Sequence, residues 1–170
     1  MQAPEIYEEI VPFPLAKLLI GIFVAISLSL LVLFIYQLLV GPVGSKPAPD
    51  LFYLFMFIFF AGLTYFVTNF NKLSITITAQ SITVGYGILK RIIPWVNVQG
   101  CYLDEASAFG SYGGWGIRMG KVKGKWRLVY NVIGCPAVVL ELERGRFREF
   151  VFSTKNAETV LEIARKQILK

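Results

Sequence analysis

The chain has 170 residues, a net charge of +6 and a composition in which 55% of the residues are hydrophobic. It contains no histidine, which removes the most common general base and metal ligand of proteins. Two long apolar stretches lie in the first 70 residues, and the composition after them is that of an ordinary soluble domain. We therefore expect a membrane segment over residues 1–70 followed by one small domain over residues 71–170.

The two apolar stretches are predicted to form a transmembrane hairpin. Residues 18–40 and 51–70 contain no Lys, Arg, Asp or Glu. A helix needs about 20 apolar residues to cross the hydrocarbon core, and both stretches reach that length. Residues 41–50 hold three prolines and indicate a short exposed turn. Residues 1–17 carry three glutamates and lack the basic start of a cleavable signal, so the hairpin should remain attached.

The distribution of Lys and Arg predicts the orientation. Residues 71–170 hold 15 of the 17 basic and 7 of the 11 acidic residues, a balance of +8, and residues 1–70 therefore carry −2. The excess of Lys and Arg places the C-terminal domain in the cytoplasm, and two spans return the N-terminus to the same side. In that reducing compartment Cys101 and Cys135 should be buried thiols rather than a disulfide.

Small residues lie on both predicted helices. Gly21, Ala25 and Ser29 recur on one face of the first helix, and the second helix offers Ala61 and Gly62. Small side chains let membrane helices approach closely. Three interpretations stay open: the stripe packs the hairpin internally, it faces another subunit, or it reflects only the abundance of small residues in membrane helices.

After residue 70 the hydrophobic period changes to two, which is typical of strands. Seven strands are predicted, over 73–78, 82–86, 98–103, 116–122, 125–132, 137–143 and 147–153. The glycine-rich stretch 106–116 indicates a long loop, and an amphipathic helix is expected after Asn156. The predicted fold class is α+β: a transmembrane hairpin, then a seven-stranded antiparallel barrel or sandwich capped by a C-terminal helix.

Four short motifs occur in a recognisable order. They are the opening strand 73–78, Ile93-Pro94 with Val98 after it, the segment 113–118 (GGWGIR) and the segment 152–158 (FSTKNAE) that leads into the helix. In their order and spacing the chain resembles the bacterial pleckstrin-homology-like domain proteins with two N-terminal transmembrane helices. The resemblance covers residues 71–170 and the preceding hairpin. It implies a fold and a location in a prokaryotic cell membrane, and no particular reaction.

No set of residues predicts catalysis. Asp104 and Glu105 are adjacent, so in a strand they point to opposite faces. Glu141 and Glu143 look like solvent-side positions, and the two cysteines have no histidine partner. The segment 113–116 lacks the Lys-Ser/Thr of a phosphate-binding loop. We therefore expect no enzymatic activity, no cofactor and no metal site.

Basic residues recur at alternate positions along two predicted hairpins. They are Lys121, Lys123, Lys125 and Arg127 on the first, and Arg144, Arg146 and Arg148 on the second. Residues of the same parity share a face of a strand, and a basic face near anionic lipid is attracted to it. Solvated strand faces that protect sheet edges are the alternative. The resemblance implies that the turn 78–83 takes the place of the lipid-phosphate pocket of eukaryotic pleckstrin-homology domains, and the absence of a basic residue from this turn argues against a pocket of that type.

The loop over 106–116 carries three aromatic residues, Phe109, Tyr112 and Trp115. Exposed aromatics at this point would contact lipid or a protein partner. For Trp115 we favour burial in the mouth of the barrel, with contact to lipid or a partner as the alternative.

These features together predict a non-enzymatic, membrane-anchored scaffold that presents a docking surface at the inner membrane face. Its partners would be the lipid bilayer and other membrane proteins or a second copy of the chain. One alternative is a module that senses anionic lipids through the basic hairpins. Another is an accessory subunit of a larger membrane complex. In that case the second helix, which holds seven of the chain's 14 phenylalanines, would contact the other subunits. Nucleic acid is not an expected partner, because membrane topology explains the positive charge.

Overall fold

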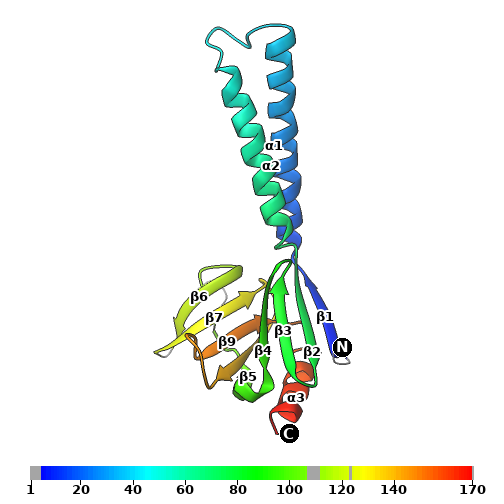
Figure 1. Cartoon of the computed structure of the whole chain (residues 1–170), viewed down its shortest axis with the longest axis vertical. Coiled ribbons are helices and arrows are strands. Elements are labelled where there is room, and N and C mark those ends of the chain that lie inside the picture. The colour runs from blue at the N-terminus through cyan, green and yellow to red at the C-terminus, as the bar shows by residue number, and fades with distance from the viewer. Residues whose placement is uncertain (1–4, 107–111, 123, 170) are drawn as a thin grey trace. The chain divides into compact units, whose positions relative to one another are not determined.

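The structure is a computed structural model that describes residues 5–106, 112–122 and 124–169. It divides into two compact units (Figure 1). One is a helical hairpin, Pro14–Asn71, and the other is a domain that combines the chain up to Phe13 with the chain from Lys72 onward. The sequence-based division grouped residues 1–70 together, whereas residues 5–13 lie in the C-terminal domain.

The hairpin consists of α1 (Pro14–Leu39) and α2 (Asp50–Thr68). By length and composition both helices are long and apolar enough to cross a membrane. They pack through larger side chains: the rings of Phe23 and Phe60 lie 5.9 Å apart, and the Ser27 hydroxyl donates to the Phe57 carbonyl at 3.4 Å. Few side chains are buried, so most of the apolar surface of both helices faces outward.

The small-residue stripe does not lie between the two helices. Gly21, Ala25 and Ser29 on α1 are exposed, and so are Ala61 and Gly62 on α2. A Cβ built on either glycine would meet no atom within 4 Å. The internal packing of the hairpin therefore does not depend on these residues, and the stripe faces away from the other helix.

The domain contains two sheets. The first, sheet A, is antiparallel in the order β1-β2-β3-β4. Its strands are β1 (Glu5–Pro12), β2 (Lys72–Thr78), β3 (Ser81–Tyr86) and β4 (Leu89–Pro94). The second, sheet B, has the order β5-β8-β9-β7-β6, with β7 and β9 parallel and the other pairs antiparallel. Its strands are β5 (Val98–Leu103), β6 (Gly116–Val122), β7 (Lys125–Asn131), β8 (Ala137–Leu142) and β9 (Glu149–Ser153).

The described residues thus form nine strands in two sheets without a closed barrel, whereas seven antiparallel strands in a barrel or sandwich are predicted; the prediction is wrong in its strand count and in the parallel pair β7–β9. The class is α+β, as predicted. The two additional strands are β1 and β4. β4 is an edge strand with only Ile93 buried, so its apolar residues show no clean alternation. β1 becomes a strand only by pairing with β2, which follows the whole hairpin in the sequence.

The core lies between the inner faces of the two sheets. Leu73, Ile75 and Ile77 of β2 alternate with partly exposed Ser and Thr and are fully buried. The Tyr86 ring stacks 6.2 Å from the Tyr130 ring of sheet B, which joins the two inner faces. The C-terminal helix α3 (Ala157–Ile168) packs against β5 and β8. Its buried residues are Ala157, Val160, Leu161 and Ala164, which recur at the three- and four-residue spacing of the predicted amphipathic helix.

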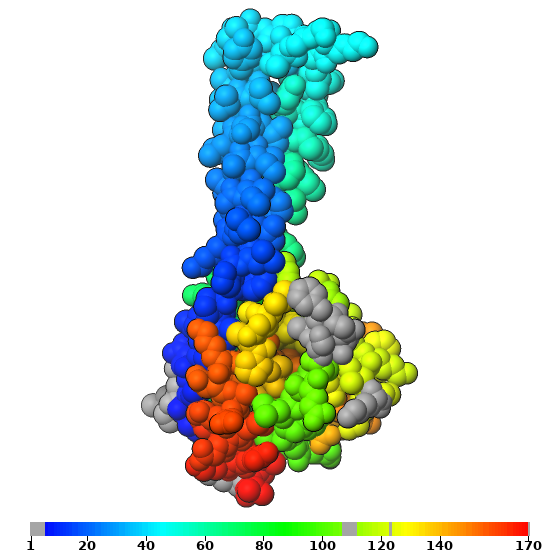
Figure 2. Space-filling model, turned by 180° about the vertical axis from the view of Figure 1, so that it is seen from behind, coloured from blue at the N-terminus to red at the C-terminus, as the bar shows by residue number. Residues whose placement is uncertain are grey.

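The N-terminal strand is fastened at two places. Its backbone pairs with β2, and its Glu9 carboxylate accepts hydrogen bonds from the Thr154 hydroxyl and from the Lys155 backbone N–H, the latter at 2.7 Å. The blue N-terminal segment and the orange segment that leads into α3 accordingly lie side by side in Figure 2. Because Glu9 is buried, its side-chain oxygens depend on hydrogen-bond donors within the protein, and the Tyr7 hydroxyl adds a third at 2.8 Å. β1 is therefore an integral part of the domain.

Candidate functional site

The outer face of sheet B carries a second small core. Val129, Val139 and Val151 lie on neighbouring strands and are fully buried, together with Tyr112 from the long loop. Ala106, at the start of that loop, packs against the same residues. The described parts of the loop therefore cover this face, which would otherwise expose a row of valines to solvent.

A buried arginine lies next to this core: Arg127 is two residues before Val129 on β7, so the two side chains share one face of the sheet. Arg127 of β7 pairs with Glu149 of β9, and Glu149 pairs with Glu141 of β8, so the three side chains share the outer face. The side chains of Arg127 and Glu149 are 5% and 2% exposed and form a direct ion pair through Arg127 Nε. The register of the parallel pair β7–β9 thus places a cation beside an anion inside the protein.

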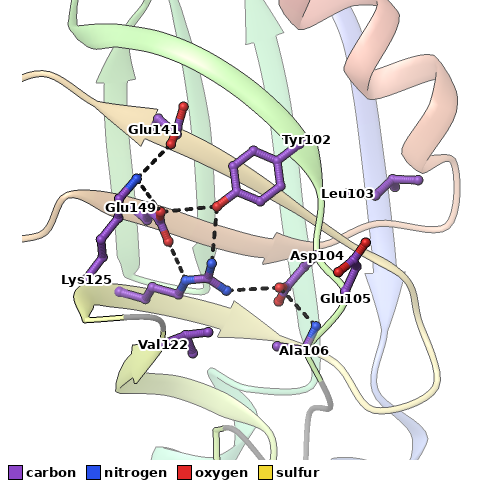
Figure 3. Close-up of a pocket in the computed structure, with 10 residues that line it drawn as sticks. Tyr102, Leu103, Asp104, Glu105, Ala106, Val122, Lys125, Glu141 and Glu149 are labelled. Carbon is purple, nitrogen blue, oxygen red and sulfur yellow. Dashed lines mark hydrogen bonds and ion pairs between the residues drawn. The ribbon is translucent and has the colours of Figure 1, made fainter.

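Arg127 also fastens the loop to the sheet. Its Nη1 donates to Asp104 at 3.0 Å and to the Tyr112 hydroxyl at 2.7 Å. The Tyr112 hydroxyl in turn donates to Asp104 at 2.7 Å. The Tyr102 hydroxyl accepts from Arg127 Nη2 at 3.2 Å and donates to Glu149 at 3.1 Å. In Figure 3, Tyr102, Asp104 and Glu149 surround the Arg127 guanidinium, and dashed lines join each of them to it.

Lys125 completes the group at its exposed side. Its Nζ lies 2.9 Å from Glu141 and 3.2 Å from Glu149 (Figure 3). We call the seven residues the Arg127 cluster: Tyr102, Asp104, Tyr112, Lys125, Arg127, Glu141 and Glu149. Each buried charge in it faces an opposite charge and further hydrogen-bond partners, which is the condition under which charges are retained inside proteins.

The ionisation of the cluster follows from these contacts. Burial disfavours the Glu149 carboxylate, but hydrogen bonds from Lys125 and Arg127 outweigh it and lower its pKa. Burial likewise disfavours the Arg127 cation, and its hydrogen bonds to Tyr112 and Glu149 nevertheless raise its pKa. Burial and the hydrogen bond to Asp104 raise the pKa of Tyr112 to about 12. All three groups are therefore held in their ordinary ionisation states at neutral pH.

The cluster opens into a cavity of about 670 Å³. Four acidic residues and two basic residues line it, so the lining has a net charge of −2. The acidic residues are Asp104, Glu105, Glu141 and Glu149, and the basic ones are Lys125 and Arg127. Leu103, Ala106 and Val122 add apolar surface. The volume falls in the range of ligand pockets, and the cavity is the candidate functional site.

The basic residues predicted from the sequence do not gather on one face. Lys121 is exposed on β6, Lys125 is engaged by two carboxylates, and Arg127 is buried. Arg144, Arg146 and Arg148 are exposed, but they lie in the turn over 143–148 between β8 and β9 and not on a strand. Lys123 lies outside the described residues.

The aromatic residues of the long loop also differ from the expectation. Tyr112 is buried rather than exposed, because its ring covers the valines of sheet B and its hydroxyl joins the Arg127 cluster. Trp115 is half-buried, and its ring centroid lies 4.6 Å from that of Phe13. Phe109 lies outside the described residues.

The cluster itself was not predicted. Glu149 is the residue that could have indicated the cluster. It begins the otherwise apolar segment EFVFS, and this strand is buried throughout. A carboxylate in such a strand requires a cation within the protein. The identity of that cation depends on the parallel pairing of β7 with β9, which periodicity along the chain does not reveal.

Within the described ranges no three Asp, Glu or Cys side chains are arranged to hold a metal ion, and both cysteines are free thiols. No family model and no curated protein matches the sequence, and no solved structure matches the fold.

Proposed function

We propose that the chain is a non-enzymatic, membrane-anchored interaction protein whose pleckstrin-homology-like domain presents the cavity beside the Arg127 cluster to a protein partner. The main observation is that ion pairs and hydrogen bonds within the protein connect the charged residues that line the cavity. A rigid, partly charged pocket is suited to recognition, because little freedom is lost on binding. In this proposal α1 and α2 are the membrane anchor.

The connections to the hairpin support the anchor. Phe13 alone separates β1 from α1, and residues 69–71 separate α2 from β2. Because β1 and β2 are neighbours in one sheet, the chain leaves and re-enters the domain at adjacent strand ends. A two-span hairpin meets this requirement, since it returns the chain to the side of the membrane from which it started. The +8 balance of residues 71–170 favours the cytoplasmic side.

The ionisation of the cluster supports a binding role rather than catalysis. A general acid or base works best with a pKa near the working pH. Here the pKa of Glu149 is lowered and the pKa values of Arg127 and Tyr112 are raised, in each case away from neutrality. The interactions of the cluster thus stabilise fixed charges, which is useful for recognising a partner of opposite sign.

The charge of the cavity indicates the chemistry of the partner. Glu105 lines the cavity and is exposed, and Glu141 is only partly buried. Their carboxylates are accessible to Lys or Arg side chains, so the proposal favours a basic segment of another protein.

Co-purification from mild detergent tests the proposal. The full chain should retain a partner, Glu105→Arg should lose it, and the matched charge reversal Glu158→Arg on the exposed face of α3 should keep it. A strictly monomeric particle without any partner would contradict the proposal. A partner retained by Glu105→Arg but lost on Phe55→Ala and Phe59→Ala, two exposed residues of α2, would favour the accessory-subunit alternative.

A further inference from the structure

One edge of the domain is defined by the strand ends that connect to the hairpin. Pro12, the last residue of β1, pairs with Lys72, the first residue of β2. The next row joins Leu73 of β2 to Tyr86 of β3, and Tyr86 pairs with Leu89 of β4. The β3–β4 turn therefore lies at the same end of sheet A as the exits to α1 and α2 (Figure 1). We call this end the exit edge.

The tip of the β3–β4 turn is an exposed apolar residue. Gly87 has a positive φ of 50°, which makes the turn tight, and Ile88 follows it with 78% of its surface exposed. Because its side chain is exposed at the tip of the turn, Ile88 does not contribute to the hydrophobic core of its own domain. It is suited to a less polar environment outside the domain.

The glycine-rich loop reaches the same edge. The Trp115 ring packs 4.6 Å from Phe13, the residue directly before α1. The next strand is tied there as well, because Gly116 pairs with Asn131, whose carbonyl accepts a hydrogen bond from Tyr86. Tryptophan is enriched where a membrane meets water. The position of Trp115 beside the residue that precedes a membrane helix agrees with that preference.

The segments that form the exit edge are rich in basic residues. The segments that form it, residues 10–13, 72–74, 85–91 and 112–118, contain no Asp or Glu. They contain four basic residues, Lys72, Lys90, Arg91 and Arg118, all exposed. Arg118 donates Nε to the Trp115 carbonyl at 3.1 Å, which holds its guanidinium beside the tryptophan. Exposed cations mixed with Trp115 and Ile88 match the headgroup layer of an anionic bilayer.

We propose that the exit edge binds the anionic lipid headgroups of the membrane in which the hairpin is anchored, with Ile88 and Trp115 entering the interface and the four cations facing the phosphates. This inference rests on the proposed membrane anchor. It assigns lipid contact to residues other than the two basic hairpins predicted from the sequence. The β2–β3 turn at Gln80 lies at the opposite end of β2, about 20 Å away along the strand, and should stay in water.

The test uses the full chain in nanodiscs, with spin labels on single cysteines in a Cys101→Ala, Cys135→Ala background. Labels are placed at Ile88→Cys, at Gln80→Cys as the control from the far turn, and at Val32→Cys in the middle of α1. Collision rates with oxygen and with a water-soluble nickel complex report the depth of each label. With phosphatidylglycerol present, the label at position 88 should show interfacial depth and the label at 80 should show free access to the nickel complex.

Charge reversal separates the lipid contact from the anchor. Lys90→Glu with Arg118→Glu should return the label at 88 to water, whereas Arg144→Glu, which reverses an exposed arginine near the far end of sheet A, should not. A label at 88 that is as accessible as that at 80, or equally immersed in neutral discs, would overturn the inference. A label at position 32 that lies in water would instead overturn the proposed anchor itself.

Discussion

Replacement of Arg127 by methionine tests the cluster that shapes the candidate site. The substitution keeps most of the side-chain volume and removes the cation from between Asp104 and Glu149, whose side chains are each 2% exposed. Removing one partner of a buried ion pair costs about 3–5 kcal/mol, because the other charge stays buried. Glu149 keeps Lys125 and Tyr102, and Asp104 keeps Tyr112 and the Ala106 N–H. These remaining partners favour the lower end, about 3 kcal/mol.

Urea unfolding followed by tryptophan fluorescence measures this loss. Because Pro12 pairs with Lys72, a tight Asn-Gly turn placed after the buried Phe13 can replace residues 14–71 and give a soluble domain for the assay. Arg144→Met, in an exposed turn, is the control and should change the free energy of unfolding by less than about 0.5 kcal/mol. If Arg127→Met costs less than about 1 kcal/mol, Asp104 and Glu149 do not depend on a buried cation and the account of the cluster is refuted.

Three further predictions concern other titratable groups. Glu9→Gln should lower the unfolding free energy by about 1–3 kcal/mol, because it weakens the bonds to the segment before α3, while the exposed Glu8→Gln should have little effect. The lowered pKa of Glu149 adds stability at pH values above its unfolded-state pKa, and this stability is lost as the pH falls below about 4. Urea midpoints measured between pH 7 and pH 3 should therefore fall less steeply for Glu149→Gln than for the unchanged protein. Burial raises the pKa values of Cys101 and Cys135, so both thiols should react with an aromatic disulfide more slowly than free cysteine at pH 8.

The helices were predictable because their signals are local. Two stretches without charge predicted α1 and α2 to within four residues at each end, and the apolar stripe after Asn156 predicted α3. A helix satisfies its backbone within one segment, so composition and period along the chain are sufficient to find it.

The missed features depend on pairing between distant segments. β1 pairs with a strand that follows the hairpin, and Arg127 meets Glu149 only because β7 and β9 are parallel neighbours. Alternation along β7 predicts a basic solvent face, whereas the long loop covers that face and buries Arg127. Period-two patterns tell which residues share a face, and tertiary packing decides whether that face is wet or dry.

Membrane topology is the most direct test of the central claim, that a membrane hairpin carries a cytoplasmic interaction domain. In a Cys101→Ala, Cys135→Ala background, Ser45→Cys marks the connector between the helices and Glu158→Cys marks the exposed face of α3. A membrane-impermeant maleimide should label position 45 in intact cells and position 158 only after the cells are permeabilised. Labelling of position 158 in intact cells, or recovery of the chain in the soluble fraction, would contradict the claim.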